Sequence, residues 1–419
     1  MIQLNEQQQA AKDQFMSFLS DTDATDFVLE GFAGTGKSTL VSVLLDESPK
    51  MLAAIQLITQ EHREWEIVCA ATTNKAAEVF GHMSGHEVKT VHKTLGLRIQ
   101  KDHKTNTAFT IEIDKRHKLR NVLLFIDEAS YLDVDLIQMI KKKCLDCKIV
   151  YIGDPAQLAP IKKTVSPIFN LGFPTAKLTA IMRQAQGNPI IELSAKFRDV
   201  VNGADWFQTE LDNHHLVWLP RHEFEAEILK VFSDPDLRGD SARVLAYTNK
   251  AVIAFNKGIR GAIQGLSDLQ IGDYAIVNNA IHTSSCKLNT DQEVCITHAQ
   301  PCTQLDVPGR MVVMDSTYEA FLPYHLEDKK QRLKQARANG HWISVAEIED
   351  QWVDLRAAFS CTINKSQGST YDKVFIDLDD VRKCNSGNQI SRLMYVAVSR
   401  ARYNVYFTGD LAKAARKAA

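Results

Sequence analysis

Gly31-Phe32-Ala33-Gly34-Thr35-Gly36-Lys37-Ser38-Thr39 is the stretch from which the architecture of this 419-residue chain is inferred. It follows the apolar run Phe27–Leu29 and precedes Leu40–Leu45, whose apolar spacing is typical of a buried helix. A buried strand, a glycine loop and a helix in this order form the context of a Walker A phosphate loop. Glycine permits the backbone angles that turn successive N–H groups toward phosphate oxygens, and a helix N-terminus adds positive potential. The stretch therefore predicts an α/β domain that binds a nucleotide; the alternative is a chance glycine turn before a core helix.

Side chains near this loop have expected roles in binding a nucleoside triphosphate and Mg²⁺. Lys37 would reach the β- and γ-phosphates, and the Ser38 hydroxyl would ligate Mg²⁺. A helix is predicted from the N-cap Asn5 to about Leu19, and Gln8 in its first turn carries an amide that can pair with an adenine edge. The more ordinary interpretation of this glutamine-rich turn is a solvated helix start. The expected contacts to the nucleotide come from Gln8, Gly34, Thr35, Gly36, Lys37, Ser38 and Thr39.

The composition is that of an ordinary globular protein, with 45% hydrophobic and 24% charged residues. No apolar run is long enough to span a bilayer and the N-terminus does not read as a signal peptide, so we expect a cytoplasmic protein without a membrane partner. The net charge of −2 gives no overall basic field, so a nucleic acid would have to bind to local patches. The 8 cysteines are scattered, which favours reduced thiols over a zinc site.

Acidic residues end the next clear strand. The apolar run Val122–Ile126 is followed by Asp127 and Glu128. Such a strand delivers carboxylates to its C-terminal tip, where Asp127 would hold Mg²⁺ through water and Glu128 would polarise the attacking water. Adjacent acids are common, but downstream of a phosphate loop they are typical of a Walker B site. Gln157, in the turn Gly153–Pro160, is the polar side chain best placed to sense a γ-phosphate.

Small polar side chains follow several other predicted strands. Thr72, Thr73 and Asn74 come directly after the strand predicted over Glu66–Ala71. Open α/β sheets bind ligands at the C-terminal ends of their parallel strands, so these positions are candidate contacts. Each of them alone is more often part of a surface loop. Similar polar ends occur at His92, at Thr248 and Asn249, and at Lys365.

The rest of the chain divides into further units. Alternation at strand period between Leu97 and Lys115 predicts a β-hairpin inserted into the first α/β unit. A second α/β unit is expected to start near Thr175 and to resume at Ala358. The segment between its two parts is predicted to hold a small β module (Ile271–Pro323) and two helices (Leu326–Ala338 and Ser344–Arg356).

The ordered series of motifs resembles the superfamily 1 DNA helicases, in particular the class of RecD-like enzymes and Dda-type helicases of large phages. The resemblance covers Leu4 to Phe407. The matching segments are Gly31–Thr39, Thr72–Lys75, Asp127-Glu128, Gly153–Pro160, Leu178–Gln184, Thr362–Thr370 and Val396–Arg402.

This resemblance implies an α/β fold with two RecA-like P-loop domains whose parallel sheets face one another across an ATP cleft. The first domain would comprise residues 1–96 and 116–174, and the second residues 175–271 and 357–419. The hairpin 97–115 would be a strand-separating pin. Residues 272–356 would form a small β-barrel with a helical arm that touches the pin.

The resemblance also assigns roles in catalysis. Arg183 and Arg400 would reach from the second domain as arginine fingers, which supply roughly 10³–10⁵ in rate. Gly368 would touch the nucleotide from the same side. The implied catalytic residues are Lys37, Glu128, Gln157, Arg183 and Arg400, with Mg²⁺ on Ser38 and Asp127.

Single-stranded DNA would cross the tops of both domains. Hydroxyl, amide and lysine groups contact phosphates without reading sequence, as a translocating motor requires. The implied contacts are Thr72, Thr73, Asn74 and His92 on one side and Thr248, Asn249 and Lys365 on the other.

The implied activity is that of a monomeric ATP-dependent helicase that moves 5′→3′ and separates forked DNA in replication or recombination. A single-strand-binding protein or replication and recombination proteins would be further partners. One departure from the family is Asn364, where histidine is usual. The alternatives are a single-strand translocase or protein-displacing motor that unwinds poorly, and a nucleotide-gated DNA-binding or loading subunit.

Overall fold

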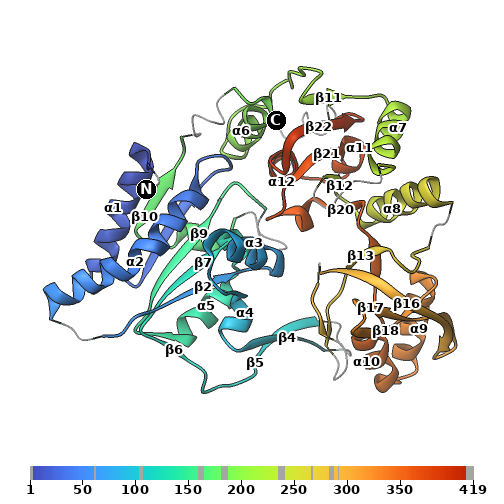
Figure 1. The fold of residues 1–419 in the computed structure, drawn as a ribbon, viewed down its shortest axis with the longest axis horizontal. Helices are drawn as coiled ribbons and strands as arrows, with labels where there is room; N and C mark the ends of the chain where they lie inside the picture. Colours follow the sequence, from blue (N-terminus) through green and yellow to red (C-terminus); the bar gives the residue numbers. More distant parts are fainter. Residues whose placement is uncertain are drawn as a thin grey trace.

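The computed structural model describes residues 3–60, 63–102, 107–158, 165–180, 187–234, 241–265, 268–282, 287–290 and 292–411. The main sheets of these residues are two parallel sheets and one antiparallel sheet (Figure 1). The phosphate loop belongs to the first parallel sheet, and the C-terminal strand belongs to the second. Among the described residues, no helix is long and apolar enough to cross a membrane.

The first parallel sheet has the strand order β10-β1-β9-β7-β2-β3. Helices cover both faces, so neighbouring residues on β1 enter different cores: Phe27 and Leu29 pack with α1 and α2, whereas Val28 packs on the other face with α5. This burial on both faces explains why the strands read as continuous apolar runs. The elements are α1 (Glu6–Ser20), β1 (Asp26–Gly31), α2 (Lys37–Thr59), β2 (Glu66–Ala71), α3 (Asn74–Ser84), β3 (Val88–Thr90), α4 (Val91–Thr94), β7 (Val122–Asp127), α5 (Val134–Lys143), β9 (Lys148–Gly153) and β10 (Thr175–Leu178).

The predicted start of the second unit near Thr175 is wrong. β10 pairs in parallel with β1, with Val28 opposite Thr175 and Gly31 opposite Leu178. The first sheet therefore keeps this strand at its edge, and the boundary falls after Leu178. The predicted N-terminal helix is confirmed, and Asn5 caps it.

The second parallel sheet has the order β11-β22-β21-β12-β20. One face packs on α6 and α12, and the other on α7 and α8. Helix α12 is buried along Ile390–Val398 because its outer side faces the first domain. The elements are α6 (Pro189–Val201), β11 (Leu216–Trp218), α7 (Arg221–Phe232), β12 (Ala242–Ala246), α8 (Asn249–Gln264), β20 (Ser360–Thr362), β21 (Tyr371–Asp377), α11 (Leu378–Val381), α12 (Gly387–Val398) and β22 (Ala401–Thr408).

The insertion in the second domain is an antiparallel sheet, here called the β module, with the order β18-β17-β16-β13-β19. The N–H of Val353 donates to the Phe321 carbonyl at 2.9 Å, which links the segment before β19 to the opposite edge strand. The elements are β13 (Tyr274–Val277), β14 (Ile281–His282), β15 (Lys287–Leu288), β16 (Glu293–Gln304), β17 (Val307–Met314), β18 (Tyr318–Pro323), α9 (Leu326–Ala338), α10 (Trp342–Gln351) and β19 (Leu355–Ala357).

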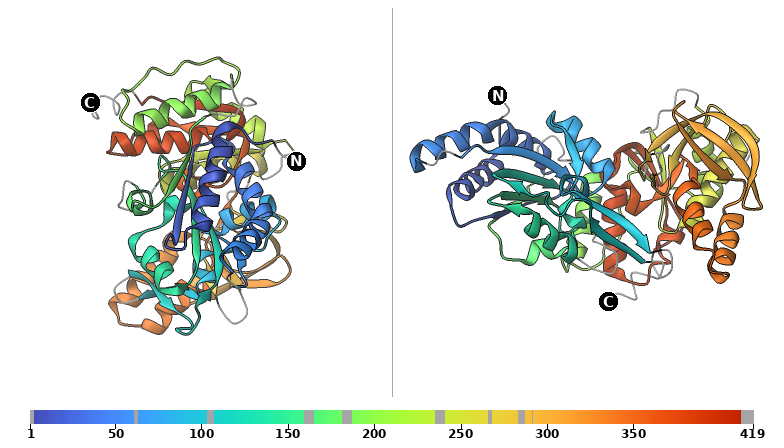
Figure 2. Two further views of the ribbon diagram at one scale, coloured as in Figure 1. Left: turned by 90° about the vertical axis from the view of Figure 1, so that its left-hand side faces the viewer. Right: turned by 90° about the horizontal axis from the view of Figure 1, so that it is seen from below.

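The predicted hairpin is present as the antiparallel strands β4 (Leu97–Asp102) and β5 (Thr107–Glu112). It extends from the first domain toward the β module in the views of Figures 1 and 2. The short strands β6 (Leu119–Arg120) and β8 (Cys144–Leu145) pair in parallel as a separate two-stranded sheet.

Candidate nucleotide site and nucleic-acid surface

The phosphate loop joins β1 to α2. Gly34 and Gly36 have φ angles of +79° and +74°, a left-handed conformation that glycine adopts without a Cβ penalty. Gly36 is also the N-cap of α2, so the first N–H groups of this helix lie at the loop. Lys37 Nζ donates to the Gly31 carbonyl at 3.1 Å, which folds the ammonium group back over the loop. The left-handed glycines and the helix N-terminus are the local features that the sequence predicted for this loop.

Gln8 of α1 forms a hydrogen bond with the main chain of this loop. Its side chain is fully buried, Nε2 donates to the Gly36 carbonyl at 3.0 Å, and Oε1 accepts from the Asn5 N–H at 3.0 Å. Asn5 in turn accepts from the Gln8 N–H, which completes a capping box. The expected contact between Gln8 and an adenine edge is therefore not what this structure has. Both ends of the amide bond within the chain, and Gln8 braces the phosphate loop.

The two acids lie at the C-terminal end of β7, facing Lys37. Burial raises the pKa of Asp127, the negative charge of Glu128 raises it further, and the Lys37 ammonium acts in the opposite sense. A cavity of about 120 Å³ is lined by these three side chains together with Ser38. Gly368 of the second domain lines the same cavity, so the site is shared between the two domains.

This set of side chains fits Mg²⁺ and a nucleoside triphosphate. Magnesium takes oxygen ligands and binds through one or two carboxylates plus phosphates, and the cavity offers the carboxylates of Asp127 and Glu128 and the hydroxyl of Ser38. The raised pKa of Asp127 is the mark of a buried anion that a cation would stabilise. Lys37 supplies the ammonium for the phosphates.

The two expected arginine fingers have different outcomes. Arg183 lies outside the described residues. Arg400 is 8% exposed and follows the C-terminus of α12. Its guanidinium donates to the carbonyls of Ser369 at 3.1 Å and Val396 at 3.2 Å, and its positive charge acts to lower the pKa of Tyr395. Arg400 thus lies in the second domain within electrostatic reach of the interface with the phosphate loop.

Tyr395 is an interface residue that the sequence did not single out. Its hydroxyl accepts from the Ala33 N–H of the phosphate loop at 2.9 Å and donates to the carboxylate of Asp154. Burial raises the pKa of both Tyr395 and Asp154. Arg392, one turn earlier on α12, donates to the carbonyls of Pro155 at 2.6 Å and Gln157 at 2.8 Å. Arg392 and Tyr395 lie three residues apart on one face of α12, and this spacing was the sequence feature that could have indicated the interdomain contact.

Gln157 contacts the second domain through its side chain. Its Oε1 accepts from Gln367 Nε2 at 3.0 Å. The Oε1 of Gln367 accepts in turn from the Tyr131 hydroxyl, and this hydroxyl lies 3.1 Å from the Asn364 carbonyl. The predicted γ-phosphate sensor is therefore part of an interdomain hydrogen-bond network, and Asn364 joins it through its main chain.

The first-domain candidates for binding DNA lie at the C-terminal ends of β2 and β3. Thr73 accepts from the Ala76 N–H at 3.1 Å and so caps α3, and Asn74 is the first residue of that helix. His92 lies in α4. Burial lowers the pKa of His92, an effect that the charge of Asp133 partly opposes, so the neutral imidazole can contact a strand by hydrogen bonding.

The side chain of Thr72, unlike the other first-domain candidates, points toward the segment that follows β7. Its hydroxyl donates to the main-chain carbonyl of Glu128 at 3.0 Å. The register of the two adjacent strands causes this contact, because Ala71 on β2 lies opposite Asp127 on β7. Thr72 is thereby joined to the main chain of the two acids, Asp127 and Glu128.

The second-domain candidates lie near the joint with the β module. Thr248 caps α8, accepting from the Ala251 N–H at 3.2 Å. Asn249 Oδ1 accepts from Arg356 at 3.1 Å. Lys365 Nζ donates to Asn278 Oδ1 at 3.0 Å.

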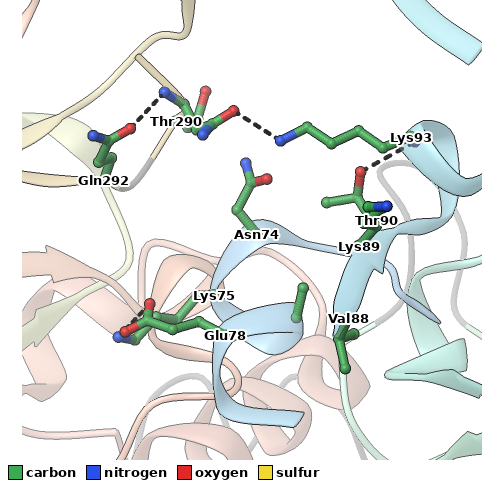
Figure 3. A pocket seen from close by; sticks show the side chains of 11 residues that line it. Asn74, Lys75, Glu78, Val88, Lys89, Thr90, Lys93, Thr290 and Gln292 are labelled. Atoms are coloured by element: carbon green, nitrogen blue, oxygen red, sulfur yellow. Dashed lines mark hydrogen bonds and ion pairs between the residues drawn. The ribbon is translucent and has the colours of Figure 1, made fainter. Parts of the chain in front are cut away.

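A second cavity, of about 320 Å³, lies between the first domain and the β module (Figure 3). Asn74 and Thr90 face it from the first domain, and Thr290 and Gln292 face it from the β module. Lys93 Nζ donates to Asn289 Oδ1 at 3.4 Å across one side of it. The cavity brings the predicted contact Asn74 together with polar groups of the β module that the sequence did not indicate. Its full lining is Asn74, Lys75, Ala77, Glu78, Val88, Lys89, Thr90, Lys93, Asn289, Thr290 and Gln292.

Two family profiles match this chain. The AAA domain matches residues 3–214, and the UvrD-like helicase C-terminal domain matches residues 357–408. The chain is 26% identical over 393 residues to the ATP-dependent RecD2 DNA helicase of Deinococcus radiodurans, covering 91% of this chain and 47% of that protein. It therefore spans about half the length of RecD2. It is 20% identical over 486 residues to an uncharacterized protein of Acanthamoeba polyphaga mimivirus, covering 95% of this chain and 98% of that protein.

Solved structures of similar fold include the Pif1 helicase from Bacteroides in complex with ADP-AlF3 and ssDNA. The TM-score is 0.51 at 17% identity, covering 97% of this chain and 92% of that chain. At this identity the likeness establishes the fold, which comprises two RecA-like domains.

Proposed function

This chain belongs to the superfamily 1 helicases of the RecD and Pif1 type, and we propose that it hydrolyses ATP to move along single-stranded DNA and to separate duplex strands. One observation carries the proposal. Lys37, Ser38, Asp127 and Glu128 of the first domain line one cavity with Gly368 of the second. A nucleotide bound there would contact both domains, so its binding and release would change how they meet.

In this site each side chain has a distinct task. Lys37 would bind the β- and γ-phosphates, and Glu128 would accept a proton from the attacking water. Bound at Ser38 and Asp127, Mg²⁺ would neutralise phosphate charge. Arg400 would approach the transferring phosphoryl group from the second domain, with Arg183 as the second expected finger.

Closure of the cleft would depend on the γ-phosphate. The interface bonds of Gln157 and Tyr395 tie the turn after β9 and the phosphate loop to the second domain. A ligand shifts such an equilibrium only by its differential affinity for the open and closed forms. The two domains would then alternate their hold on the strand, through Thr73, Asn74 and His92 on one side and Thr248, Asn249 and Lys365 on the other.

The hairpin β4–β5 would act as the strand-separating pin, because it projects beyond the first domain toward the β module (Figure 1). Shortening it between Lys101 and Thr107 is expected to remove unwinding and to preserve DNA-stimulated ATP hydrolysis. Gel separation of fork products and a phosphate-release assay check this on the same protein. Unwinding that survives the shortening would exclude the pin role.

The experiment that tests the function is unwinding of matched forks that carry a single 5′ or a single 3′ tail. We expect ATP-dependent unwinding of the 5′-tailed fork alone, with Lys37→Ala as the inactive control. Unwinding of the 3′-tailed fork would reverse the polarity. Hydrolysis stimulated by DNA without unwinding of either fork would indicate a translocase, and hydrolysis indifferent to DNA would indicate a nucleotide-gated loading subunit.

A further inference from the structure

The turn Thr72–Ala76 touches three parts of the molecule at once. It follows β2 and includes the first three residues of α3. Thr72 contacts the segment of the catalytic acids, Asn74 faces the cavity below the β module, and Ala76 lies against the second domain. At the last contact, a Cβ on Gly368 would lie 3.7 Å from the Ala76 main chain.

The link to the acids runs through main-chain groups. The Thr72 hydroxyl donates to the Glu128 carbonyl at 3.0 Å, and the Thr72 N–H donates to the Asp127 carbonyl at 3.3 Å. Glu128 has φ +53°, a left-handed conformation that non-glycine residues seldom adopt and that costs free energy unless neighbouring groups hold it. The Thr72 hydroxyl is one of the groups that hold it.

The left-handed backbone conformation of Glu128 sets the direction of its Cα–Cβ bond relative to β7. A change to a right-handed or extended conformation would redirect the side chain relative to the cavity that it shares with Lys37 and Asp127. The Ser130 hydroxyl also contacts this carboxylate, but its Oγ lies 3.5 Å from Glu128 Oε2, a distance that gives little restraint. The main-chain contact from Thr72 is therefore the shorter of the two.

We propose that Thr72 is a positioning residue through which a bound single strand aligns Glu128 for hydrolysis. The inference rests on the proposed function. A strand held by Thr73 and Asn74 would fix the turn, the Thr72 hydroxyl would then fix the Glu128 carbonyl, and the water-activating carboxylate would be held over the cavity. Without a strand the turn is less restrained, and Glu128 samples orientations that do not support hydrolysis.

Thr72→Val tests this step, because valine keeps the shape of threonine and removes the hydroxyl. Thr72→Ser restores a hydroxyl, and Thr303→Val, at an exposed position on β16, is the matched control. For each protein, kcat and KM for ATP are measured with and without single-stranded oligothymidine, and the Kd for the oligonucleotide is measured by fluorescence anisotropy.

The expected result for Thr72→Val is an about fivefold smaller stimulation of kcat by DNA, the factor that corresponds to one neutral hydrogen bond of about 1 kcal/mol. Its KM for ATP and its Kd for the oligonucleotide stay within about twofold of wild type, Thr72→Ser recovers most of the stimulation, and Thr303→Val retains all of it.

Two outcomes overturn different claims. A wild-type protein stimulated by DNA together with an equally stimulated Thr72→Val overturns the inference and leaves the proposed function. A wild-type protein that hydrolyses ATP at the same rate with and without DNA overturns the proposed function itself. A fall in both the stimulated and the unstimulated kcat, in equal proportion, shows that Thr72 only supports the fold of the site and also overturns the inference.

Discussion

Two turns of this molecule have the same sequence, Thr-Asn-Lys-Ala, but different contacts hold them in place. Thr73–Ala76 follows β2 in the first domain, and Thr248–Ala251 follows β12 in the second. In both turns the threonine caps the next helix, accepting from the N–H three residues on at 3.1 Å and 3.2 Å. In both, the neighbouring parallel strand brings acidic residues alongside the turn. The two turns, each taken with the residue directly before it, differ in which atoms of those acids they contact: main-chain carbonyls in the first domain and a carboxylate in the second.

In the first domain the neighbouring strand ends in Asp127 and is followed by Glu128. Thr72, the residue directly before the turn, bonds to the main-chain carbonyls of both acids. Their carboxylates stay in the nucleotide cavity. In the second domain the neighbouring strand leads to α11, whose Asp380 is 1% exposed. This carboxylate accepts from the N–H groups of Tyr247 and Thr248, each at 2.8 Å, and from the Thr248 hydroxyl at 2.7 Å.

These different contacts should make the first-domain turn sensitive to a bound nucleotide and keep the second-domain turn fixed. A charge-assisted hydrogen bond to a buried carboxylate is about twice as strong as a neutral one, so Asp380 holds its turn firmly. The first-domain turn is held through Thr72 by neutral bonds to Asp127 and Glu128, whose carboxylates would meet Mg²⁺ and the nucleotide under the proposed function. We therefore expect the first-domain turn to respond to the nucleotide state and the second-domain turn to keep one conformation.

The largest expected effect comes from Lys37→Ala, which removes the phosphate contact and leaves both turns in place. ATP hydrolysis should fall by about 10²–10³-fold or more, the loss typical of removing one preorganised electrostatic group. Binding of single-stranded DNA in the absence of ATP should be retained. Phosphate release and anisotropy measure the two quantities, and hydrolysis at the wild-type rate would contradict the nucleotide site.

The next effect concerns the fixed turn. Asp380→Asn keeps the shape of the side chain and replaces one acceptor by a donor that faces the N–H groups of Tyr247 and Thr248. The free energy of unfolding should fall by about 1.5–3 kcal/mol, the range for hydrogen bonds to charged groups, and the Kd for single-stranded DNA should rise about tenfold while KM for ATP is unchanged. Urea denaturation and anisotropy measure these changes.

Asp379→Asn is the matched control for this variant. Asp379 is the neighbouring acid on α11, and its partners are Arg221 and Arg382 at the surface. Its replacement should change the Kd for DNA by less than about twofold, because surface ion pairs contribute about 0–1 kcal/mol. Equal effects of the two substitutions on DNA binding would show that Asp380 has no special hold on the turn.

The pH dependence of stability sharpens the same comparison. Burial raises the pKa of Asp380, but the bonds from Lys383, Thr248 and Tyr247 outweigh it, so its folded pKa is below the usual value. A depressed carboxyl pKa stabilises the fold at pH above the unfolded value of about 3.9 and loses this contribution as the pH falls through the folded pKa. The difference in unfolding free energy between wild type and Asp380→Asn should therefore be constant from about pH 7 to 5 and shrink below about pH 4. A difference that grows toward acid would contradict the assignment.

The smallest effect is expected for Lys365→Ala. Loss of one cationic contact to a phosphate should reduce the slope of log K for single-stranded DNA against log salt by about 0.7. Titrations at several salt concentrations measure the slope. An unchanged slope would place Lys365 off the strand, in a purely structural bond with Asn278.

Much of the nucleotide site follows from the sequence, because it depends on local patterns. A strand, a glycine loop and a helix predict the conformation of Gly34 and Gly36, and an apolar run that ends in acids predicts where Asp127 lies. The alternation of apolar and polar residues at strand period likewise predicted the hairpin β4–β5. These features require no knowledge of distant partners.

The misassigned and missed features depend on tertiary contacts. β10 is a short edge strand whose partner β1 lies far away in sequence, so the pattern near Thr175 resembled the start of a new unit. Gln8 was assigned to adenine, although Asn5 three residues earlier already gave the pattern of a capping box. The bonds of Tyr395 to the phosphate loop and of Asp380 to the second turn arise only when separate elements pack together.

The most direct measurement of the central claim is amide hydrogen exchange of the two turns, with and without a non-hydrolysable ATP analogue and Mg²⁺, in the absence of DNA. The account predicts slower exchange on nucleotide binding at Thr72, Ala76 and Ala77. It predicts unchanged exchange at Thr248, Ala251 and Val252. Equal protection of both turns, or protection of the second turn alone, would contradict it.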